Sequence, residues 1–304
     1  MKIKNYLRDP FKYTVLHLAD HGKLDRLSDE KYLKLMYRAK FKKKLNLNSP
    51  KTFNEKLQWI KLYDRKDIYT TMVDKYEVKK YVADIIGEEY VIPMLGVWDG
   101  FEDIDFDALP DKFVLKTTHD SGGIVICRDK AAFDIEKARE KLTKSLAREY
   151  FPHGREWPYK NVKHRILAEE YVQDGDNPNL PVFKIFNFGG KPTVIQVIQN
   201  DKTKSETIDY FDTGWHRLDL RQNFPNSENP LPKPSSLEVM LSLAERLSDG
   251  FPFLRTDFYT VNGEVRFSEF TFFSDSGLAK FHPEEWDKRL GDMIVLPRNK
   301  NGWE

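Results

Sequence analysis

The sequence has almost no cysteine, no long apolar run and almost no net charge. Cys127 is the single cysteine among 304 residues, so no internal disulfide can form, which is typical of a reducing compartment such as the cytoplasm. No apolar run reaches the roughly 18 residues that a membrane-spanning helix needs, so we expect at most a peripheral contact with the inner face of a membrane. The formal net charge of +1 disfavours nucleic-acid binding by bulk electrostatics.

Familiar nucleotide fingerprints are missing as well. The glycine-containing loop at 120–123 differs from the Walker pattern, because its lysine precedes the glycines, and it does not match G-x-G-x-x-G. Aspartates with the D-x-D spacing of many glycosyltransferases occur three times, at Asp103–Asp105, Asp105–Asp107 and Asp174–Asp176. About two such matches arise by chance in a chain with this many aspartates, so these pairs carry almost no weight.

Hydrophobic periodicity predicts a helical front followed by strands. Helical spacing is present in residues 1–50 and 69–86, and Thr52 and Glu55 between them have the spacing of a capping box. Short apolar runs predict strands at 113–116, 123–127, 165–172, 182–188 and 193–199. Further helices are expected at 131–148 and 236–248. The predicted fold class is therefore α+β.

The segment FLRTDFYTVNGEVRFSEFTFF, residues 253–273, has the alternating pattern of a β-hairpin around Asn262-Gly263. Arg255, Asp257 and Glu269 lie among its aromatic residues, and a covered carboxylate needs a partner. The partner is either Mg²⁺, which usually takes one or two carboxylates with phosphate oxygens, or Arg255 in a buried ion pair. A two-residue loop would turn the two acids to opposite faces. We therefore predict a three-residue turn with a bulge at Gly263, which puts Arg255, Asp257, Glu269 and Thr271 on one face.

Two earlier segments join a strand to a polar loop. In FVLKTTHDSGGIVICRDK, residues 113–130, Lys116 precedes a loop whose backbone N–H groups suit phosphate oxygens. A hairpin with an edge lysine is the alternative. In ILAEEYVQDGD, residues 166–176, an apolar strand runs into two glutamates, and the free backbone groups of a strand end suit the edge of an adenine. An ordinary strand end is the alternative there.

The order of these parts resembles the ATP-grasp superfamily. The segments NSPKTFNEKLQWIKLY, VDKYEVKKYV, LPDKFVLKTTHDSGG, FKIFNFGGKP, LRTDFYTVNGEVRFSEFTFFSDSG and FHPEEWDKRLG are similar to its TupA-like, teichuronopeptide-synthesis branch, over roughly residues 28–292. The resemblance implies two α+β subdomains that sandwich ATP behind a helical N-terminal region. We expect that region, with a reduced pre-ATP-grasp segment, over 1–110, a subdomain with a glycine-rich flap over 111–173, and a C-terminal subdomain with the Mg²⁺ site over 174–304.

The resemblance also implies roles for particular residues. The ATP-binding set would be Lys75, Lys116, Ser121, Gly122, Gly123, Glu169, Glu170, Tyr171, Val172 and Lys184. One or two Mg²⁺ ions would be held by Asp257, Glu269 and Thr271, where Thr271 replaces the asparagine that is usual in the superfamily. The residues placed at the transferred phosphoryl group or the acceptor would be Arg255, Lys202 and His119.

The activity implied by the resemblance is that of an ATP- and Mg²⁺-dependent carboxylate–amine ligase. The expected substrates are ATP, a carboxylate from a uronic acid or an amino acid, and an amine, in the synthesis of a capsule or another cell-envelope polysaccharide. A glycosyltransferase acting on the same polymers, an ATP-grasp kinase of a sugar or glycan, and a catalytically inactive ATP-grasp scaffold remain as alternatives.

Overall fold

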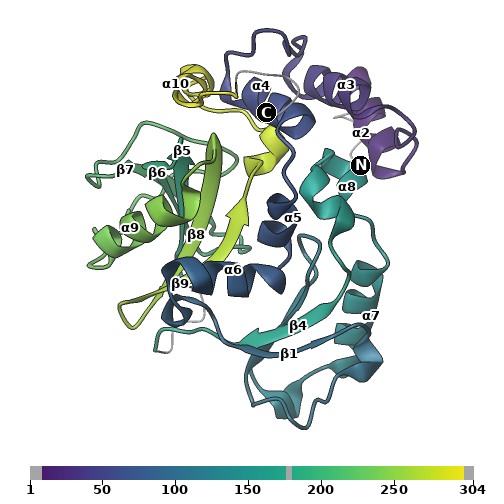
Figure 1. Cartoon of the computed structure of the whole chain (residues 1–304), viewed down its shortest axis with the longest axis vertical. Coiled ribbons are helices and arrows are strands. Elements are labelled where there is room, and N and C mark those ends of the chain that lie inside the picture. The colour runs from purple at the N-terminus through teal and green to yellow at the C-terminus, as the bar shows by residue number, and fades with distance from the viewer. Residues whose placement is uncertain (1–8, 176–179, 298–304) are drawn as a thin grey trace.

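The computed structural model describes residues 9–175 and 180–297, which form two antiparallel sheets and a helical front (Figure 1). The front consists of helices α2 (Pro10–Asp20), α3 (Asp29–Phe41) and α4 (Phe53–Tyr63). The predicted capping box begins α4: Thr52 Oγ1 accepts from the Glu55 N–H, and Glu55 Oε2 accepts from the Thr52 N–H. Local chemistry therefore sets the start of this helix.

Helix α4 attaches the front to the C-terminal part of the chain. The ring of Phe53 packs edge-on against Phe253 and Phe281. The N–H and the side-chain amide of Asn54 both donate to Asp287 Oδ1, at 2.9 Å, from helix α10 (Glu285–Met293). The front and the C-terminal sheet consequently share one hydrophobic core.

The helix predicted at 69–86 is two helices, α5 (Ile68–Val73) and α6 (Glu77–Ile86). Asp74 breaks it, because its backbone is extended and its Oδ1 accepts from the N–H groups of Tyr76, at 2.8 Å, and Glu77, at 3.4 Å. Gly87, at φ 115°, ends α6. The break leaves Lys75 between two helices, where its side chain faces the neighbouring sheet.

A four-stranded sheet has the order β1-β4-β2-β3. Its strands are β1 (Met94–Trp98), β2 (Phe113–Thr117), β3 (Ile124–Cys127) and β4 (Ile166–Glu170). Helix α7 (Ile135–Leu146) covers it through Ala138 and Leu142, which are fully buried in a second core. The helix predicted at 131–148 begins later, after a 3₁₀ turn at Lys130–Ala132. Strand β1 lies in the stretch expected to be helical, 1–110, and pairs with β4, so that stretch contributes an edge to this sheet.

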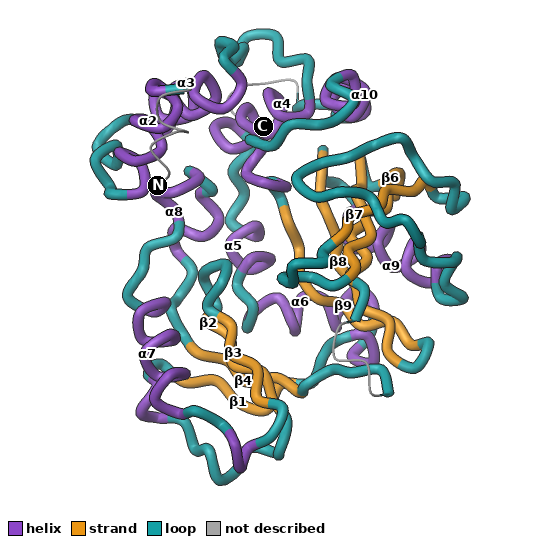
Figure 2. The backbone as a smooth tube through the Cα atoms, turned by 180° about the vertical axis from the view of Figure 1, so that it is seen from behind, coloured by secondary structure: helices purple, strands orange, loops and turns teal. Residues whose placement is uncertain are grey.

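A five-stranded sheet has the order β7-β6-β5-β8-β9. Its strands are β5 (Val182–Phe188), β6 (Lys191–Gln199), β7 (Thr207–Asp212), β8 (Phe253–Val261) and β9 (Glu264–Thr271). Helix α9 (Leu237–Ser248) packs on it through an apolar face that includes Met240, Ala244 and Leu247. Seen from behind, α5 and α6 lie between the two sheets (Figure 2).

The β8–β9 hairpin departs from the predicted turn. Its loop has only two residues, Asn262 and Gly263, both with positive φ, at 51° and 81°. The odd residue is accommodated within β9, where Ser268 forms a bulge opposite the Asp257–Phe258 step. Asp257 therefore pairs with Glu269. The three-residue turn was wrong, but the register that it was meant to produce is the one observed.

The described helices are short. The longest, α3, has 13 residues, and no helix within residues 9–175 and 180–297 combines the length and the apolar character that a bilayer crossing needs.

Candidate active site

A cavity of about 560 Å³ is lined by residues of both sheets and of α6. The walls include apolar side chains from each sheet, among them Val114, Ile126, Val182 and Phe267. Eleven of the residues predicted from the sequence line it: Lys75, Lys116, Ser121, Glu169, Glu170, Tyr171, Val172, Lys184, Lys202, Asp257 and Glu269. The fold thus brings together side chains that are separated by up to 194 residues in the chain.

Glu169 is a buried carboxylate between two lysines. Lys116 Nζ lies 2.5 Å from Glu169 Oε2, and Lys79 Nζ lies 3.0 Å from Oε1. Burial raises the pKa of Glu169, but the two ammonium groups outweigh it and hold this pKa below its ordinary value. Burial lowers the pKa of Lys79, whereas for Lys116 the attraction of Glu169 outweighs burial and raises the pKa. The trio leaves one net positive charge at the cavity, which suits a polyanion.

Lys75 connects the α5–α6 break to the loop at 117–123, which we call the flap loop. Its Nζ donates to the carbonyl oxygens of Thr117, at 3.1 Å, and Asp120. An ammonium group has three donors, so one remains for a ligand. Burial lowers the pKa of Lys75. Asp120 in turn accepts from the hydroxyls of Thr117 and Ser145, both at 2.5 Å, which ties the flap loop to α7.

The flap loop requires glycine at positions 122 and 123 for two different structural reasons. Gly122 has φ 104°, a conformation that other residues rarely adopt. At Gly123 a Cβ atom would lie 1.9 Å from Thr117 Oγ1 and 2.2 Å from Ser145 Oγ, so packing alone requires glycine there. Neither glycine lies in the cavity wall, whereas Ser121 next to them does.

The segment after β4 forms one end of the cavity. Tyr171 and Val172 line it, and the Glu170 N–H donates to the Pro93 carbonyl oxygen at 3.1 Å. Arg128 Nε donates to Tyr171 Oη at 3.1 Å, and its guanidinium lies over the same ring, 5.7 Å from the centroid. Beside the charged groups of Arg128 and Glu170, Tyr171 and Val172 thus offer an aromatic and an aliphatic surface that suits a flat heterocycle.

Arg255, Asp257 and Lys184 form a buried ion cluster at the opposite end. Arg255 Nε and Nη2 donate to Asp257 Oδ1 and Oδ2 at 2.7 and 2.8 Å, and Lys184 Nζ lies 3.2 Å from Oδ2. Burial raises the pKa of Asp257, but the two cations outweigh it and lower this pKa. Glu269 stands across the strand pair, with Oε1 3.6 Å from Arg255 Nη2 and the side chain 48% exposed. The alternative predicted for this hairpin, a buried arginine–acid pair, is thus present.

The donor set fits Mg²⁺ only together with a ligand. Among the described residues, no three His, Cys, Asp or Glu side chains gather closely enough to hold a metal ion. Asp257 and Glu269 are direct cross-strand partners, whose Cβ atoms lie about 5 Å apart in such a pair. A carboxylate has about four lone-pair sites, so Asp257 can serve Arg255 and still face an ion. Two carboxylates completed by phosphate oxygens are the usual Mg²⁺ arrangement.

A second cavity, of about 370 Å³, adjoins the first and shares Lys75, Ser121, Lys184 and Glu269 with it. Arg255 and Thr271 line this second cavity. Part of its wall comes from the segment REWPYKN, residues 155–161. Burial raises the pKa of Glu156 and of Tyr159 in this segment.

Two predicted residues lie apart from these arrangements. His119 is fully buried outside both cavity walls. Its ring stacks on His164 at 3.5 Å, and Nε2 lies 3.0 Å from the Arg148 carbonyl oxygen. The ring thus packs within the flap loop and not on either cavity wall, and its predicted contact with a phosphate or the acceptor stays a prediction. Lys202 lies on an exposed turn at the rim, 3.6 Å from Asp201. Asp176, half of one D-x-D pair, lies outside the described residues.

The comparison with known families follows this geometry. A family model described as "TupA-like ATPgrasp" matches residues 55–295, most of the chain. The chain belongs to the TupA-like ATP-grasp family. None of the curated proteins matches it.

This TupA-like protein is also similar to solved structures, at low identity. It is 16% identical to the D-alanine–D-alanine ligase of Bacillus anthracis complexed with ATP, with a TM-score of 0.39 and coverage of 66% of this chain and 55% of the other. It is 15% identical to a RimK domain ATP-grasp protein of Sphaerobacter thermophilus, with a TM-score of 0.40 and coverage of 76% of this chain and 70% of the other. The chain spans less than two thirds of the length of the D-alanine–D-alanine ligases it matches.

The TupA-like site contains residues that sequence reasoning missed. Lys79 lies in the first turn of α6, four residues after Lys75 in the chain, and this proximity to a predicted ATP lysine could have indicated it. Arg128, which directly follows β3, was not predicted. Glu156 lies in the segment REWPYKN, residues 155–161, whose mixture of charged and aromatic residues suggests either a sugar or acceptor site or a packed loop.

The turn after β9 separates the second cavity from the helical front. Asp275 and Ser276 both have positive φ, at 48° and 56°, an uncommon conformation for such residues. Lys61 of α4 is fully buried and donates to Ser276 O at 2.8 Å, Ser276 Oγ at 2.7 Å and Gly154 O at 2.8 Å. Gln58 Nε2 donates to the carbonyl oxygens of Ser276 and Gly277. Helix α4 thereby holds this strained turn in place.

We expect the buried Lys61 to make the free energy of unfolding change with pH between about 8 and 10.5. Burial lowers its pKa from 10.5 to about 8. Between these two values the unfolded chain binds a proton that the folded chain does not, so this group makes the free energy of unfolding rise with pH, by at most about 1.4 kcal/mol per unit. Urea unfolding at a series of pH values would show this rise in the wild type relative to Lys61→Met. Lys80→Met, at an exposed site, is the matched control, and parallel curves for wild type and Lys61→Met would contradict the expectation.

Proposed function

We propose that the protein is an ADP-forming carboxylate–amine ligase that uses ATP and Mg²⁺. The observation that carries this proposal is the placement of Asp257 and Glu269 as cross-strand partners on a cavity that also contains Lys75, Lys116 and Lys184. Cations and paired acids converging on one cavity suit a nucleotide triphosphate, and membership of the TupA-like ATP-grasp family supports that ligand.

The proposed reaction has two steps. A carboxylate oxygen attacks the γ-phosphorus of ATP, the bond to the β-phosphate oxygen breaks, and ADP leaves as an acyl phosphate forms. An amine then attacks the acyl carbon, loses a proton and forms an amide, and inorganic phosphate leaves. Bound Mg²⁺ would neutralise charge on the phosphate oxygens and orient them for in-line transfer.

The chain's own residues would orient the reactants and exclude water. Tyr171 and Val172 would cover the adenine, while Lys75 and Lys116 would hold the phosphates. Asp257 and Glu269 would hold the metal ion, with Thr271 beside them. Arg255 is positioned beside both acids, where a fixed guanidinium stabilises negative charge that develops on the transferred group. Ser121 of the flap loop lines both cavities, so its loop can shield the acyl phosphate from water.

The proposed acid substrate is a uronic acid of a cell-envelope polysaccharide or its precursor, to which an amine or an amino acid is attached. The family name supports a polysaccharide setting. A position close to the inner face of the membrane, where such precursors are assembled, is part of the same proposal.

A turnover assay tests the reaction class. Purified protein is incubated with Mg-ATP, galacturonate oligomers and a panel of amino acids, and ADP and phosphate are measured. We expect release of both to require the acid and the amine together. ADP release with the acid alone would indicate a kinase, and UDP release from a nucleotide-sugar would indicate a glycosyltransferase; either outcome contradicts the ligase.

Lys116→Met tests the nucleotide site independently of turnover. Loss of a charge that faces the phosphates should weaken ATP binding by about tenfold or more, measured by calorimetry. Lys112→Met is the matched control, because Lys112 is exposed just before the same strand and bonds to Gln173. Equal ATP affinity of both variants would mean that the phosphates lie elsewhere.

A further inference from the structure

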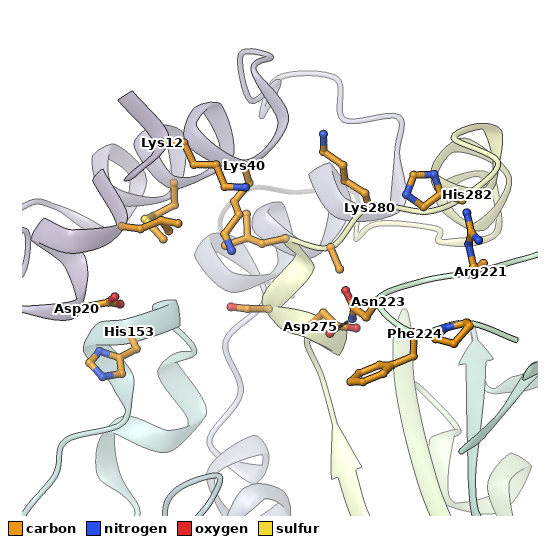
Figure 3. Close-up of a pocket in the computed structure, with 16 residues that line it drawn as sticks. Lys12, Asp20, Lys40, His153, Arg221, Asn223, Phe224, Asp275, Lys280 and His282 are labelled. Atoms are coloured by element: carbon orange, nitrogen blue, oxygen red, sulfur yellow. Dashed lines mark hydrogen bonds between the residues drawn. The ribbon is translucent and has the colours of Figure 1, made fainter. Parts of the chain in front are cut away.

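A third cavity, of about 800 Å³, is lined by Asp275 and Ser276 of the Ser274–Gly277 turn, by α2 and α3, and by the segments at 221–225 and 278–282 (Figure 3). Figure 3 shows residues of α2 and α3 on one wall, His153 of α8 (Phe151–Gly154) below them, and the segments at 221–225 and 278–282 opposite. None of the residues predicted from the sequence to bind ATP or metal lines this cavity. Its volume is at the upper end of the range for ligand pockets. The cavity is therefore larger than a single amino acid would fill.

Four unpaired cations line this cavity: Lys12, Lys40, Arg221 and Lys280. Within the described residues, none of their charged groups has a hydrogen-bond or ion-pair partner, although Lys12 lies over the Tyr13 ring. The next lysines along α3 behave differently, since Lys42 pairs with Asp9 and Lys43 with Glu284. Burial is the main cause that lowers the pKa of Lys40; the charge of Lys12 lowers it further, whereas Asp20 and Asp275 oppose the shift.

Negative charge in the cavity is smaller and partly engaged. Asp20 and Asp275 are the acids in its wall, and Asp275 Oδ1 already accepts from Asn223 Nδ2 at 2.8 Å. The imidazole rings of His153 and His282 also line this cavity. The cations come from four separate segments, so they would meet several spaced charges of an extended anion better than one compact charge.

An aromatic ring in the same wall narrows the ligand class. Phe224 is 39% exposed and lies in the cavity wall beside Asn223 (Figure 3). An exposed ring offers a flat apolar face, on which the C–H face of a sugar can pack, while the surrounding lysines and arginine bind carboxylates. Free phosphate or pyrophosphate would use the cations but would gain nothing from this ring.

The cavity adjoins the second cavity at the Ser274–Gly277 turn. Asp275 and Ser276 line both this cavity and the second one, which contains Arg255 and Glu269. The turn that carries them is held by Lys61 and Gln58. A chain lying in the large cavity would pass a fixed turn and end beside Arg255.

We propose that this cavity binds the acid substrate as an oligosaccharide with several carboxylates, anchoring its remote residues while one carboxylate reaches Arg255. The proposal rests on the proposed function for the reaction at that carboxylate, but the binding itself needs neither ATP nor an amine. We call this cavity, lined by Lys12, Lys40, Arg221, Lys280 and Phe224, the acid-sugar cavity.

Binding of tetragalacturonate to the full chain without ATP tests the proposal. Calorimetry should show binding of tetragalacturonate and none of the neutral maltotetraose at the same concentration, with affinity that falls as salt rises. Lys40→Gln with Lys280→Gln should weaken the binding by about tenfold or more. Phe224→Ala should weaken it as well, and all variants should keep the ATP affinity of the wild type.

The double variant Lys42→Gln with Lys43→Gln is the control for a general loss of positive charge, because it removes two nearby lysines that do not line the cavity. Equal loss in this control and in the cavity variant would overturn the proposal, as would equal binding of maltotetraose. Displacement of tetragalacturonate by pyrophosphate at a much lower concentration would overturn it in favour of a phosphate site. If tetragalacturonate binds but ADP release does not depend on the amine, the ligase proposal fails and the acid-sugar cavity is supported. If single uronic acids are turned over with an amine but tetragalacturonate does not bind, the ligase proposal is supported and the acid-sugar cavity is overturned.

Discussion

Glu269→Gln is expected to lower amine-dependent ADP release by about 10²–10³-fold while the protein stays folded. The change keeps the size of the side chain and removes the charge of one of the two acids proposed to hold Mg²⁺. Loss of that charge removes part of a stabilisation worth several kcal/mol in the transition state, which corresponds to this rate factor. Because the side chain is 48% exposed, its removal leaves no buried charge without a partner.

The measurement compares turnover and the Mg²⁺ concentration for half-maximal rate in wild type and Glu269→Gln. Glu264→Gln is the control on the same strand, because Glu264 is exposed near the hairpin tip and pairs with Arg266. We expect that variant to behave as the wild type does. If Glu269→Gln keeps both the rate and the Mg²⁺ dependence, Glu269 is not a metal ligand.

Arg255→Leu is expected to lower the free energy of unfolding by about 3–5 kcal/mol. Arg255 is 7% exposed and neutralises Asp257, which is 1% exposed. Removing the guanidinium leaves the carboxylate buried with Lys184 alone, which lies 3.2 Å from Oδ2. A buried charge that loses its bidentate partner also loses the interaction that offset its desolvation.

Urea denaturation of wild type, Arg255→Leu, Asp257→Leu and the double variant measures this effect. The double variant should recover part of the loss, because no buried carboxylate then remains. Arg266→Leu is the control for loss of an arginine in the same hairpin, where the more exposed pair with Glu264 contributes only about 0–1 kcal/mol. Similar losses in Arg255→Leu and Arg266→Leu would show that the buried pair has no special role in stability.

Local signals in the sequence were sufficient for much of the fold. The capping box of Thr52 and Glu55 needs only residues within one helical turn. The glycine pair at 189–190 between the apolar runs 182–188 and 193–199 predicts a tight hairpin, and the structure forms it between β5 and β6. The break at Asp74 was missed, because the apolar spacing of 69–86 continues across it and a side-chain bond to two N–H groups decides the outcome.

The sequence indicated many of the residues that line the candidate site, but it did not indicate which of them contact one another. Most of the predicted lysines and acids line one cavity. The resemblance assigned Lys116 to phosphate and Glu169 to adenine, whereas the structure joins their side chains at 2.5 Å. Contacts over this separation depend on strand pairing, which no local pattern specifies. The stacking of His119 on His164 likewise joins the flap loop to the segment just before β4, and no local pattern specifies that contact.

The bulge at Ser268 separates the tip of the β8–β9 hairpin from the acids below it. Adding one residue to each strand between the bulge and Asn262-Gly263 would lengthen the tip and keep Asp257 opposite Glu269. A single added residue between Ser268 and Glu269 would move Glu269 out of its pairing. The register therefore allows the tip to change length in steps of two, whereas an insertion between the bulge and Glu269 would break the pairing of the two acids.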